Sequence, residues 1–248
     1  MKNLLKKVLR QNPTIYDRVS RLYGLVASRH PLHSEIIKAT AGLSSRLRFI
    51  QLGASDGMLN DPFRAFVVER KWTSVLVEPI PTSFDRLCSN YKHLISCGQV
   101  RAINAAVSYC GQEKLRLYRF SKTFIEQHPN ANVTDFLQKT SFDASHLTKW
   151  GATSVSDLEE IEVDTITIEA IADKYFGGEI DFLAMDLEGY EVNVLLQVNL
   201  DLVSPRVILF EIEHIPADKF KTIEDRLSAF HYKIQVHGSD AIAIRSHR

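Results

Sequence analysis

Short apolar runs separated by amphipathic stretches begin near residue 47 and define the predicted fold. Alternation of buried strands with helices is typical of a parallel, doubly wound α/β sheet. The strands expected from the main apolar runs are Arg48–Leu52, Ser74–Val77, Val100–Asn104, Phe182–Met185 and Val207–Ile212. Helical periodicity follows most of these runs, so we expect helices to connect the strands and to cover both faces of the sheet.

The alternation is interrupted in the middle of the chain. Gln112–Phe120 alternates polar and apolar residues, which predicts an antiparallel strand. Residues 121–160 are polar and weakly patterned, and strand-like alternation resumes at Ile161–Ile168. A long segment of this kind is often functional. We therefore expect an insertion at about 110–160 within the main domain.

The composition supports one main domain, whereas the distribution of charge distinguishes the first 48 residues from the rest of the chain. Of the 248 residues, 45% are hydrophobic, which is enough to build a sizeable core. Residues 1–48 carry ten Lys and Arg and only two acids, although the whole chain has no net charge. We expect a basic helical cap at 1–45 that packs on the acidic domain at 46–248. Peripheral contact of these helices with an anionic membrane surface is the alternative.

The cysteines and the apolar runs bear on localisation. Cys88, Cys97 and Cys110 are odd in number and lack metal-ligand spacing, which indicates a reducing, cytoplasmic setting. No apolar run is long enough to span a membrane. Lysines also interrupt the first apolar residues, MKNLLKK, so we expect no signal peptide.

The loop after the first strand and the acid after the second predict a nucleoside site. In doubly wound sheets, ligands lie beyond the carboxyl ends of the strands, where the strand order reverses. Gly53 and Gly57 in LGASDGMLN allow close approach of a ligand, and the helix expected after them offers free N–H groups. Glu78 ends the second strand, where a carboxylate can accept both hydroxyls of a ribose.

The same loop distinguishes between two nucleoside ligands. A dinucleotide fingerprint needs G-x-G-x-x-G, but the register from Gly53 reads GASDGM and lacks the second and third glycines. An NAD(P)-linked oxidoreductase is therefore disfavoured. S-adenosylmethionine carries a ribose and no phosphate, and its amino acid end can meet the Gly53–Gly57 loop and Asp56.

Several segments resemble the FkbM-type methyltransferase family in family order, over about residues 48–215. The two most specific are EPIPTSFDRL and DFLAMDLEGYE, and the others are FIQLGASDGMLNDPF, INAAVS, TSFDASHLTKW, VDTITIEAIADKY and PRVILFEIEH. The resemblance implies a Rossmann-like class I methyltransferase fold with a seven-stranded, mostly parallel sheet. It also implies transfer of a methyl group from S-adenosylmethionine to a hydroxyl, most often of a saccharide or glycan. No nucleic acid partner is expected.

The resemblance assigns roles position by position. It places Glu78 at the ribose and Asp186 among both the cofactor-binding and the catalytic residues. The remaining cofactor-binding residues would be Gly53, Ala54, Ser55, Asp56, Pro79, Asn104 and Ala105. Independently of the resemblance, we expect substrate contacts from Ser141, Phe142 and His146 of the insertion and from Glu213, although His146 could instead be a surface residue of a helix. Aromatic faces such as Phe142 stack on sugar rings.

The acids that follow the fourth and fifth strands supply the expected chemistry. Alternation along a strand puts Asp186 and Glu188 on one face, and likewise Glu211 and Glu213. A sugar hydroxyl is a poor nucleophile, so a base must accept its proton. Either His214 or Asp186 is that base, with Glu188 nearby. Alternatively, Asp186, Glu213 and His214 hold Mg²⁺ or Ca²⁺, which lowers the pKa of the hydroxyl. We favour the metal-free version.

A non-catalytic module that binds a glycan or a partner protein on the same fold is the alternative function. The intact acids argue against it, because buried charge is costly to retain without use. The oligomeric state is left open by the sequence.

Overall fold

The computed structural model describes residues 31–58, 61–111, 114–128, 140–142, 144–148 and 151–246. Residues 1–30, most of the predicted basic cap, lie outside the described residues, and so do the helices and the membrane contact expected there. Within the described part of the chain, no helix is both long and apolar enough to cross a membrane.

The apolar runs form a seven-stranded sheet in the order β10-β11-β9-β8-β1-β2-β3. Its strands are β1 (Arg48–Leu52), β2 (Thr73–Val77), β3 (Val100–Ile103), β8 (Phe182–Met185), β9 (Val207–Glu211), β10 (Tyr232–His237) and β11 (Asp240–Arg245). The pairs among β1, β2, β3, β8 and β9 are parallel, and β11 pairs antiparallel with β9 and β10. The prediction of a doubly wound, mostly parallel sheet is confirmed, and its strand order reverses at β1.

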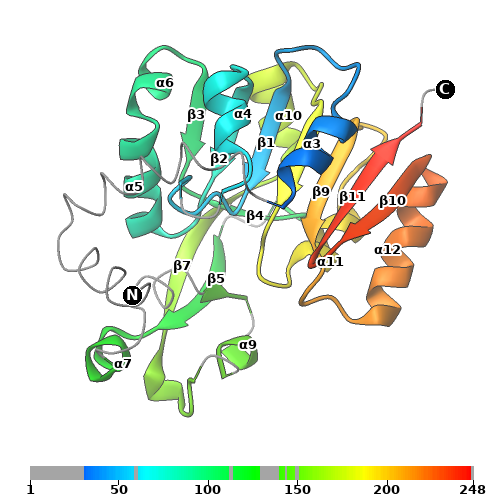
Figure 1. Ribbon diagram of the computed structural model, residues 1–248. Helices are drawn as coiled ribbons and strands as arrows, with labels where there is room; N and C mark the ends of the chain where they lie inside the picture. Colours follow the sequence, from blue (N-terminus) through cyan, green and yellow to red (C-terminus); the bar gives the residue numbers. More distant parts are fainter. Residues whose placement is uncertain are drawn as a thin grey trace, which may run out of the picture.

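Helices cover both faces of this sheet, as parallel strands require (Figure 1). One apolar core lies under α3 (His33–Ala39), α4 (Arg64–Glu69), α5 (Pro81–Asn90) and α6 (Lys92–Ser96). The other lies under α10 (Ile168–Phe176), α11 (Glu191–Gln197) and α12 (Ala217–Ala229). Leu32 and Ile36, at the end of the predicted cap, are buried in the first core.

Local sequence signals explain several helix ends. Pro81 stands in the first turn of α5, where its missing N–H costs no hydrogen bond. The Thr167 side chain accepts a hydrogen bond from Ala170 N and so caps α10. Gly177 ends that helix with a left-handed φ of 64°.

The segment after the first strand differs from the prediction. We expected a helix to follow Gly57 directly, but α4 begins only at Arg64. Just before the helix, the Asp61 carboxylate accepts the Phe63 N–H at 2.8 Å. Asp61, Pro62 and Phe63 line a cavity at the edge of the sheet where the strand order reverses.

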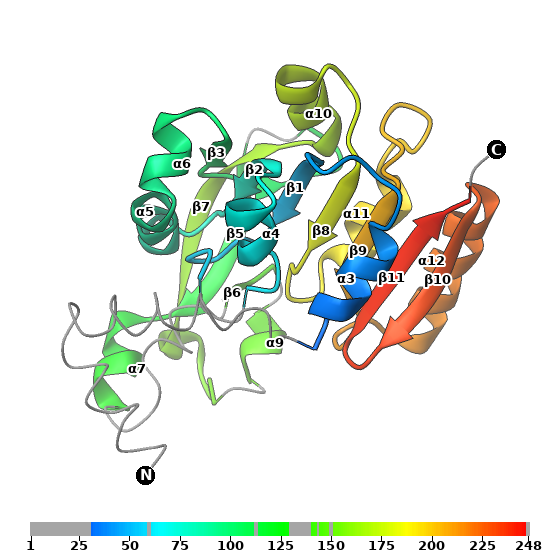
Figure 2. The same cartoon turned by 45° about the horizontal axis from the view of Figure 1, so that its top comes forward.

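A second, four-stranded sheet is built from the insertion in the order β4-β7-β5-β6. Its strands are β4 (Ala106–Val107), β5 (Lys114–Phe120), β6 (Thr140–Ser141) and β7 (Leu158–Ile166). β5 pairs antiparallel with β7, as the alternation at residues 112–120 predicted. The insertion also contains α7 (Lys122–Gln127), α9 (Ala144–Thr148) and a 3-10 turn, Val155–Asp157. These elements project to one side of the main sheet (Figure 2).

Candidate active site

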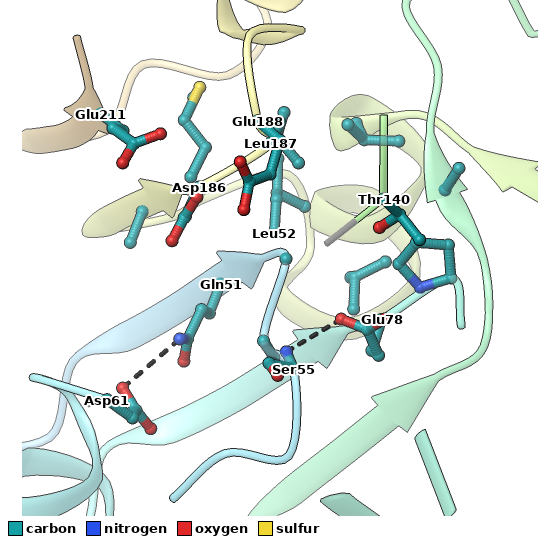
Figure 3. Close-up of a pocket in the computed structure, with 18 of the residues that line it drawn as sticks. Gln51, Leu52, Ser55, Asp61, Glu78, Thr140, Asp186, Leu187, Glu188 and Glu211 are labelled. Carbon is teal, nitrogen blue, oxygen red and sulfur yellow. Dashed lines mark hydrogen bonds between the residues drawn. The ribbon is translucent and has the colours of Figure 1, made fainter. Parts of the chain in front are cut away.

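A cavity of about 840 Å³ lies at the carboxyl ends of β1, β2, β8 and β9. This is the edge at which doubly wound sheets bind ligands. Residues from the strand ends form its floor, and Thr140, Ser141 and Phe142 of the insertion form part of its wall. Figure 3 shows the acids of β8 and β9 on one side and Glu78 at the far end from Asp61.

Gly53 brings the ends of β1 and β8 together. It has a φ of 76°, and a Cβ placed there would lie 1.9 Å from the Asp186 carbonyl oxygen. Gly53 N and Ala54 N both donate to Val77 O at 3.0 Å, which fastens the loop to β2 as well. Only glycine allows this approach of two backbones, so the sequence signal at Gly53 has a structural reason.

Glu78 is buried at the end of β2 and holds the loop in place. Its carboxylate accepts Ser55 N at 2.8 Å and Ile80 N at 2.9 Å. Burial raises the pKa of Glu78 to about 7, an effect that these hydrogen bonds oppose and the charges of Asp186 and Asp56 reinforce. Ser55 adopts a φ of 48°, which is unusual for a residue with a side chain. Such strain often marks a functional site.

Of the remaining predicted cofactor residues, Ala54, Pro79 and Ala105 line the cavity, whereas Asp56 and Asn104 are not among its lining residues. The Asp56 side chain is buried and accepts Met58 N at 2.9 Å. Asn104 donates to Glu78 O at 2.8 Å and to Pro79 O at 3.1 Å. Both side chains therefore support the loops that carry Ser55 and Glu78, and their expected contact with the cofactor stays a prediction.

Four ionisable residues gather at the ends of β8 and β9. Asp186 is exposed to solvent, and Asp186, Glu188 and Glu211 line the cavity. His214 Nε2 lies 3.5 Å from Glu188 Oε2, outside the lining residues. Burial raises the pKa of Glu211 to about 8, and the charges of Asp186 and Glu188 contribute. Glu211 therefore carries a proton at neutral pH for most of the time.

Candidate metal ligands occur in two overlapping sets among the described residues. In each set, the ligand atoms lie within 4.8 Å of one another; the sets are Glu188, Glu211 and His214, and Asp186, Glu191 and Glu211. Neither set contains Glu213. The buried Glu191 carboxylate accepts Leu187 N and Gly189 N, so it also holds the turn that carries Glu188.

Strand alternation was the wrong basis for the positions of Glu188 and Glu213. β8 ends at Met185 and β9 at Glu211, so the alternating pattern stops before both residues. Glu188 reaches the cavity through a left-handed backbone conformation with a φ of 52°. Glu213 is exposed in a turn beyond the lining residues. The expectation that it would face the acceptor is therefore corrected.

The insertion contributes an aromatic part of the wall. Ser141 is buried and lines the cavity beside Phe142. The Phe142 ring stacks on Tyr190 with a centroid distance of 3.9 Å, and the Tyr109 ring lies 6.3 Å from that of Tyr190. His146 lies in α9, and its side chain falls outside the described residues.

Sequence reasoning missed Gln51, Asp61 and Asp240, all of which line the cavity. Asp61 was assigned to a helix, and Asp240 to the turn before the last strand. Gln51 was treated as part of an apolar strand, although a polar residue inside a buried run was a usable signal.

Comparison with known proteins identifies the family. The model of the methyltransferase FkbM domain matches residues 51–234, which is most of the chain. No protein of curated function matches the chain in sequence.

Solved structures with similar folds are distant in sequence. Methyltransferase FkbM from Methylobacillus flagellatus is 13% identical with a TM-score of 0.48, and the match covers 83% of this chain and 47% of that one. The chain thus spans about half the length of that relative. An RNA methyltransferase from Salinibacter ruber bound to S-adenosylhomocysteine is 10% identical (TM-score 0.40, covering 88% and 93%). Aeropyrum pernix fibrillarin with S-adenosylmethionine is 11% identical (TM-score 0.42, covering 88% and 74%).

The family match covers the glycine loop after β1, the acid after β2 and the DFLAMDLEGYE segment, which together surround the cavity. The chain belongs to the FkbM methyltransferase family.

Proposed function

We propose that the protein transfers a methyl group from S-adenosylmethionine to a hydroxyl of an uncharged acceptor, most consistently a saccharide. The charge of the cavity carries this proposal. Among the described lining residues, six are acids and none is Lys, Arg or His; the acids are Asp61, Glu78, Asp186, Glu188, Glu211 and Asp240. Such a wall favours a cationic ligand and repels phosphate.

The residues present fit S-adenosylmethionine better than a dinucleotide. Its sulfonium and ammonium groups carry positive charge, whereas the pyrophosphate of NAD(P) carries negative charge that this wall would repel. Glu78 lines the cavity, where its carboxylate would accept hydrogen bonds from ribose hydroxyls, and Gly53 lines it without a side chain that would obstruct the ligand. When bound, the cofactor supplies a methyl group already activated by the sulfonium.

The same charge argues against a nucleic acid acceptor. Proteins that bind nucleic acids neutralise phosphates with Lys and Arg, and the described cavity wall offers neither. Carboxylates instead accept hydrogen bonds from hydroxyl groups, which a sugar has in abundance. The Phe142 ring provides an aromatic face on which a sugar ring can stack.

Asp186 is the side chain that we propose to accept the proton of the acceptor hydroxyl. It lies on the cavity wall and remains exposed to solvent, so it can reach an acceptor. Glu211 is kept mainly protonated because burial and the charge of Asp186 raise its pKa, so its proton can donate a hydrogen bond and orient the acceptor. His214, beside Glu188, is more remote from the cavity and would act through Glu188.

No metal is required in this proposal, because the leaving sulfur is already positively charged. EDTA should therefore leave turnover unchanged. Loss of activity with EDTA and recovery with Mg²⁺ or Ca²⁺ would instead favour a site at Glu188, Glu211 and His214.

The proposal is tested by incubating the full chain with methyl-labelled S-adenosylmethionine and pools of oligosaccharides, lipids, small metabolites or RNA. We expect label in a saccharide pool that is lost in the Asp186→Asn variant. Label in RNA alone would refute the acceptor class. Cofactor binding without transfer to any pool would favour the non-catalytic alternative.

A further inference from the structure

Two side chains that sequence reasoning missed, Gln51 and Asp61, meet at one end of the cavity (Figure 3). Gln51 is only 7% exposed and so is Asp61. Gln51 Nε2 lies 3.4 Å from Asp61 Oδ1, and both residues line the cavity. A carboxylate and an amide are thus held together below the surface, on the opposite side from Glu78 (Figure 3).

The protein itself leaves part of this pair unsatisfied. Asp61 Oδ1 accepts Phe63 N at 2.8 Å, and Tyr91 Oη lies 3.4 Å from Oδ2. Gln51 Oε1 is buried, and no described residue donates a hydrogen bond to it. A buried carbonyl oxygen without a donor costs free energy, so such atoms are rare and call for an explanation.

Nearby positive charge does not supply the missing donor. The Arg64 guanidinium lies over the Tyr91 ring, 4.9 Å from its centroid, and donates to Gly57 O at 3.4 Å. Arg64 lowers the pKa of Asp61, but burial outweighs it and raises that pKa to about 6. Asp61 is therefore a buried acid that a cation entering the cavity would stabilise.

We propose that Asp61 and Gln51 Oε1 together receive the α-ammonium group of S-adenosylmethionine, an inference that rests on the proposed function. An ammonium has three N–H donors, which matches one carboxylate and one orphan carbonyl oxygen. With Glu78 at the ribose, an extended cofactor would place its amino acid at the far end of the cavity. Asp61 is thus a binding residue for the cofactor, and Gln51 its partner.

The test compares two ligands that differ in the amino acid end, which includes the ammonium group. S-adenosylhomocysteine carries the amino acid end, and 5′-methylthioadenosine shares the adenosine and sulfur but lacks it. Calorimetric titration of each ligand into the full chain gives a ratio of affinities for every variant. Asp61→Asn should weaken S-adenosylhomocysteine about 10–100-fold, as expected for a hydrogen bond to a charged group. Gln51→Leu should weaken it about 3–10-fold, as expected for a neutral acceptor. Neither should change affinity for 5′-methylthioadenosine.

Asp240→Asn is the matched control, because Asp240 is an aspartate that lines the same cavity but is not paired with Gln51. It should leave the ratio of the two affinities unchanged. A merely structural role for Asp61 would weaken both ligands equally and would overturn the inference. The inference would also be overturned if Asp61→Asn bound both ligands with the affinities of the wild type. If the unaltered chain binds neither ligand, the proposed function itself fails.

Discussion

Replacing Gly53 by alanine tests how closely the ends of β1 and β8 must approach. The added Cβ would lie 1.9 Å from the Asp186 carbonyl oxygen, a distance that two atoms cannot adopt. One of the two backbones must therefore move. The residue also has a φ of 76°, a left-handed conformation that costs an L-residue about 1–2 kcal/mol.

The magnitude follows from these two costs. Forcing extra volume into packed structure costs about 1–3 kcal/mol. Alanine also restricts the unfolded chain more than glycine does, which favours the folded state by about 0.4–1 kcal/mol. We therefore expect Gly53→Ala to lower the free energy of unfolding by about 1–4.5 kcal/mol, of which about 1–3 kcal/mol is steric. It should also weaken S-adenosylhomocysteine, because the displaced carbonyl belongs to the cavity wall.

Gly42→Ala is the control, since Gly42 has a φ of 83° and nothing within 4 Å of an added Cβ. It should lose about 1 kcal/mol, the conformational cost alone. Urea unfolding of both variants gives the free energies, provided that the slope with denaturant is unchanged. Equal losses in the two variants would show that the two strand ends can separate at no cost, and would refute the steric explanation.

Three further outcomes are expected. Glu78→Ala should weaken S-adenosylhomocysteine by about 1.5–3 kcal/mol in calorimetric titration, the value for hydrogen bonds to a charged group; unchanged affinity would remove the ribose assignment. Asp186→Asn should lower turnover by about 100-fold or more while leaving cofactor affinity nearly unchanged, as expected of a general base, and equal turnover would dismiss that role. The protein without ligand should be more stable at pH 5.5 than at pH 8, because the folded-state pKa values of Glu78 and Glu191, about 7, and of Glu211, about 8, exceed their unfolded values. Stability therefore falls progressively from about pH 4.5, where these groups ionise in the unfolded chain, until pH passes their folded-state values of about 7 to 8. Urea unfolding of Glu211→Gln at the two pH values should show a smaller fall in the free energy of unfolding.

The sequence predicted the sheet well because hydrophobic burial dictates it. Each parallel strand is enclosed by helices on both faces and reads as an apolar run, so its limits are visible in the pattern. Gly53 and Glu78 were found for a related reason. Both stand at the carboxyl end of such a run, where the strand order places ligands.

The residues that were missed or misplaced lie beyond the ends of regular strands and helices, where periodic patterns no longer predict side-chain direction. Alternation predicted Glu213 beside Glu211, but the strand ends at Glu211 and the turn carries Glu213 outward. Asp61 was taken for a helical residue, yet α4 begins only at Arg64, and the Asp61 carboxylate accepts the Phe63 N–H just before it. The rotation of Glu188 into the cavity depends on a positive φ, which no periodic pattern reports.

The role of Asp56 and Asn104 needed tertiary information of a different kind. Both types of side chain suit a nucleoside site, and both stand at the right strand ends. Their hydrogen bonds to Met58 N and to Glu78 O, which no pattern in the sequence reports, show that they also support the loops. Side-chain direction, rather than residue type or spacing, separates a residue that binds a ligand from one that positions it.

A crystal structure of the full chain with S-adenosylhomocysteine tests the central claim most directly. The proposed site predicts the ribose hydroxyls on Glu78 and the ammonium group between Asp61 and Gln51 Oε1, with Asp186 left open toward an acceptor. A ligand bound outside this cavity, or bound within it in the reverse direction, would contradict the claim.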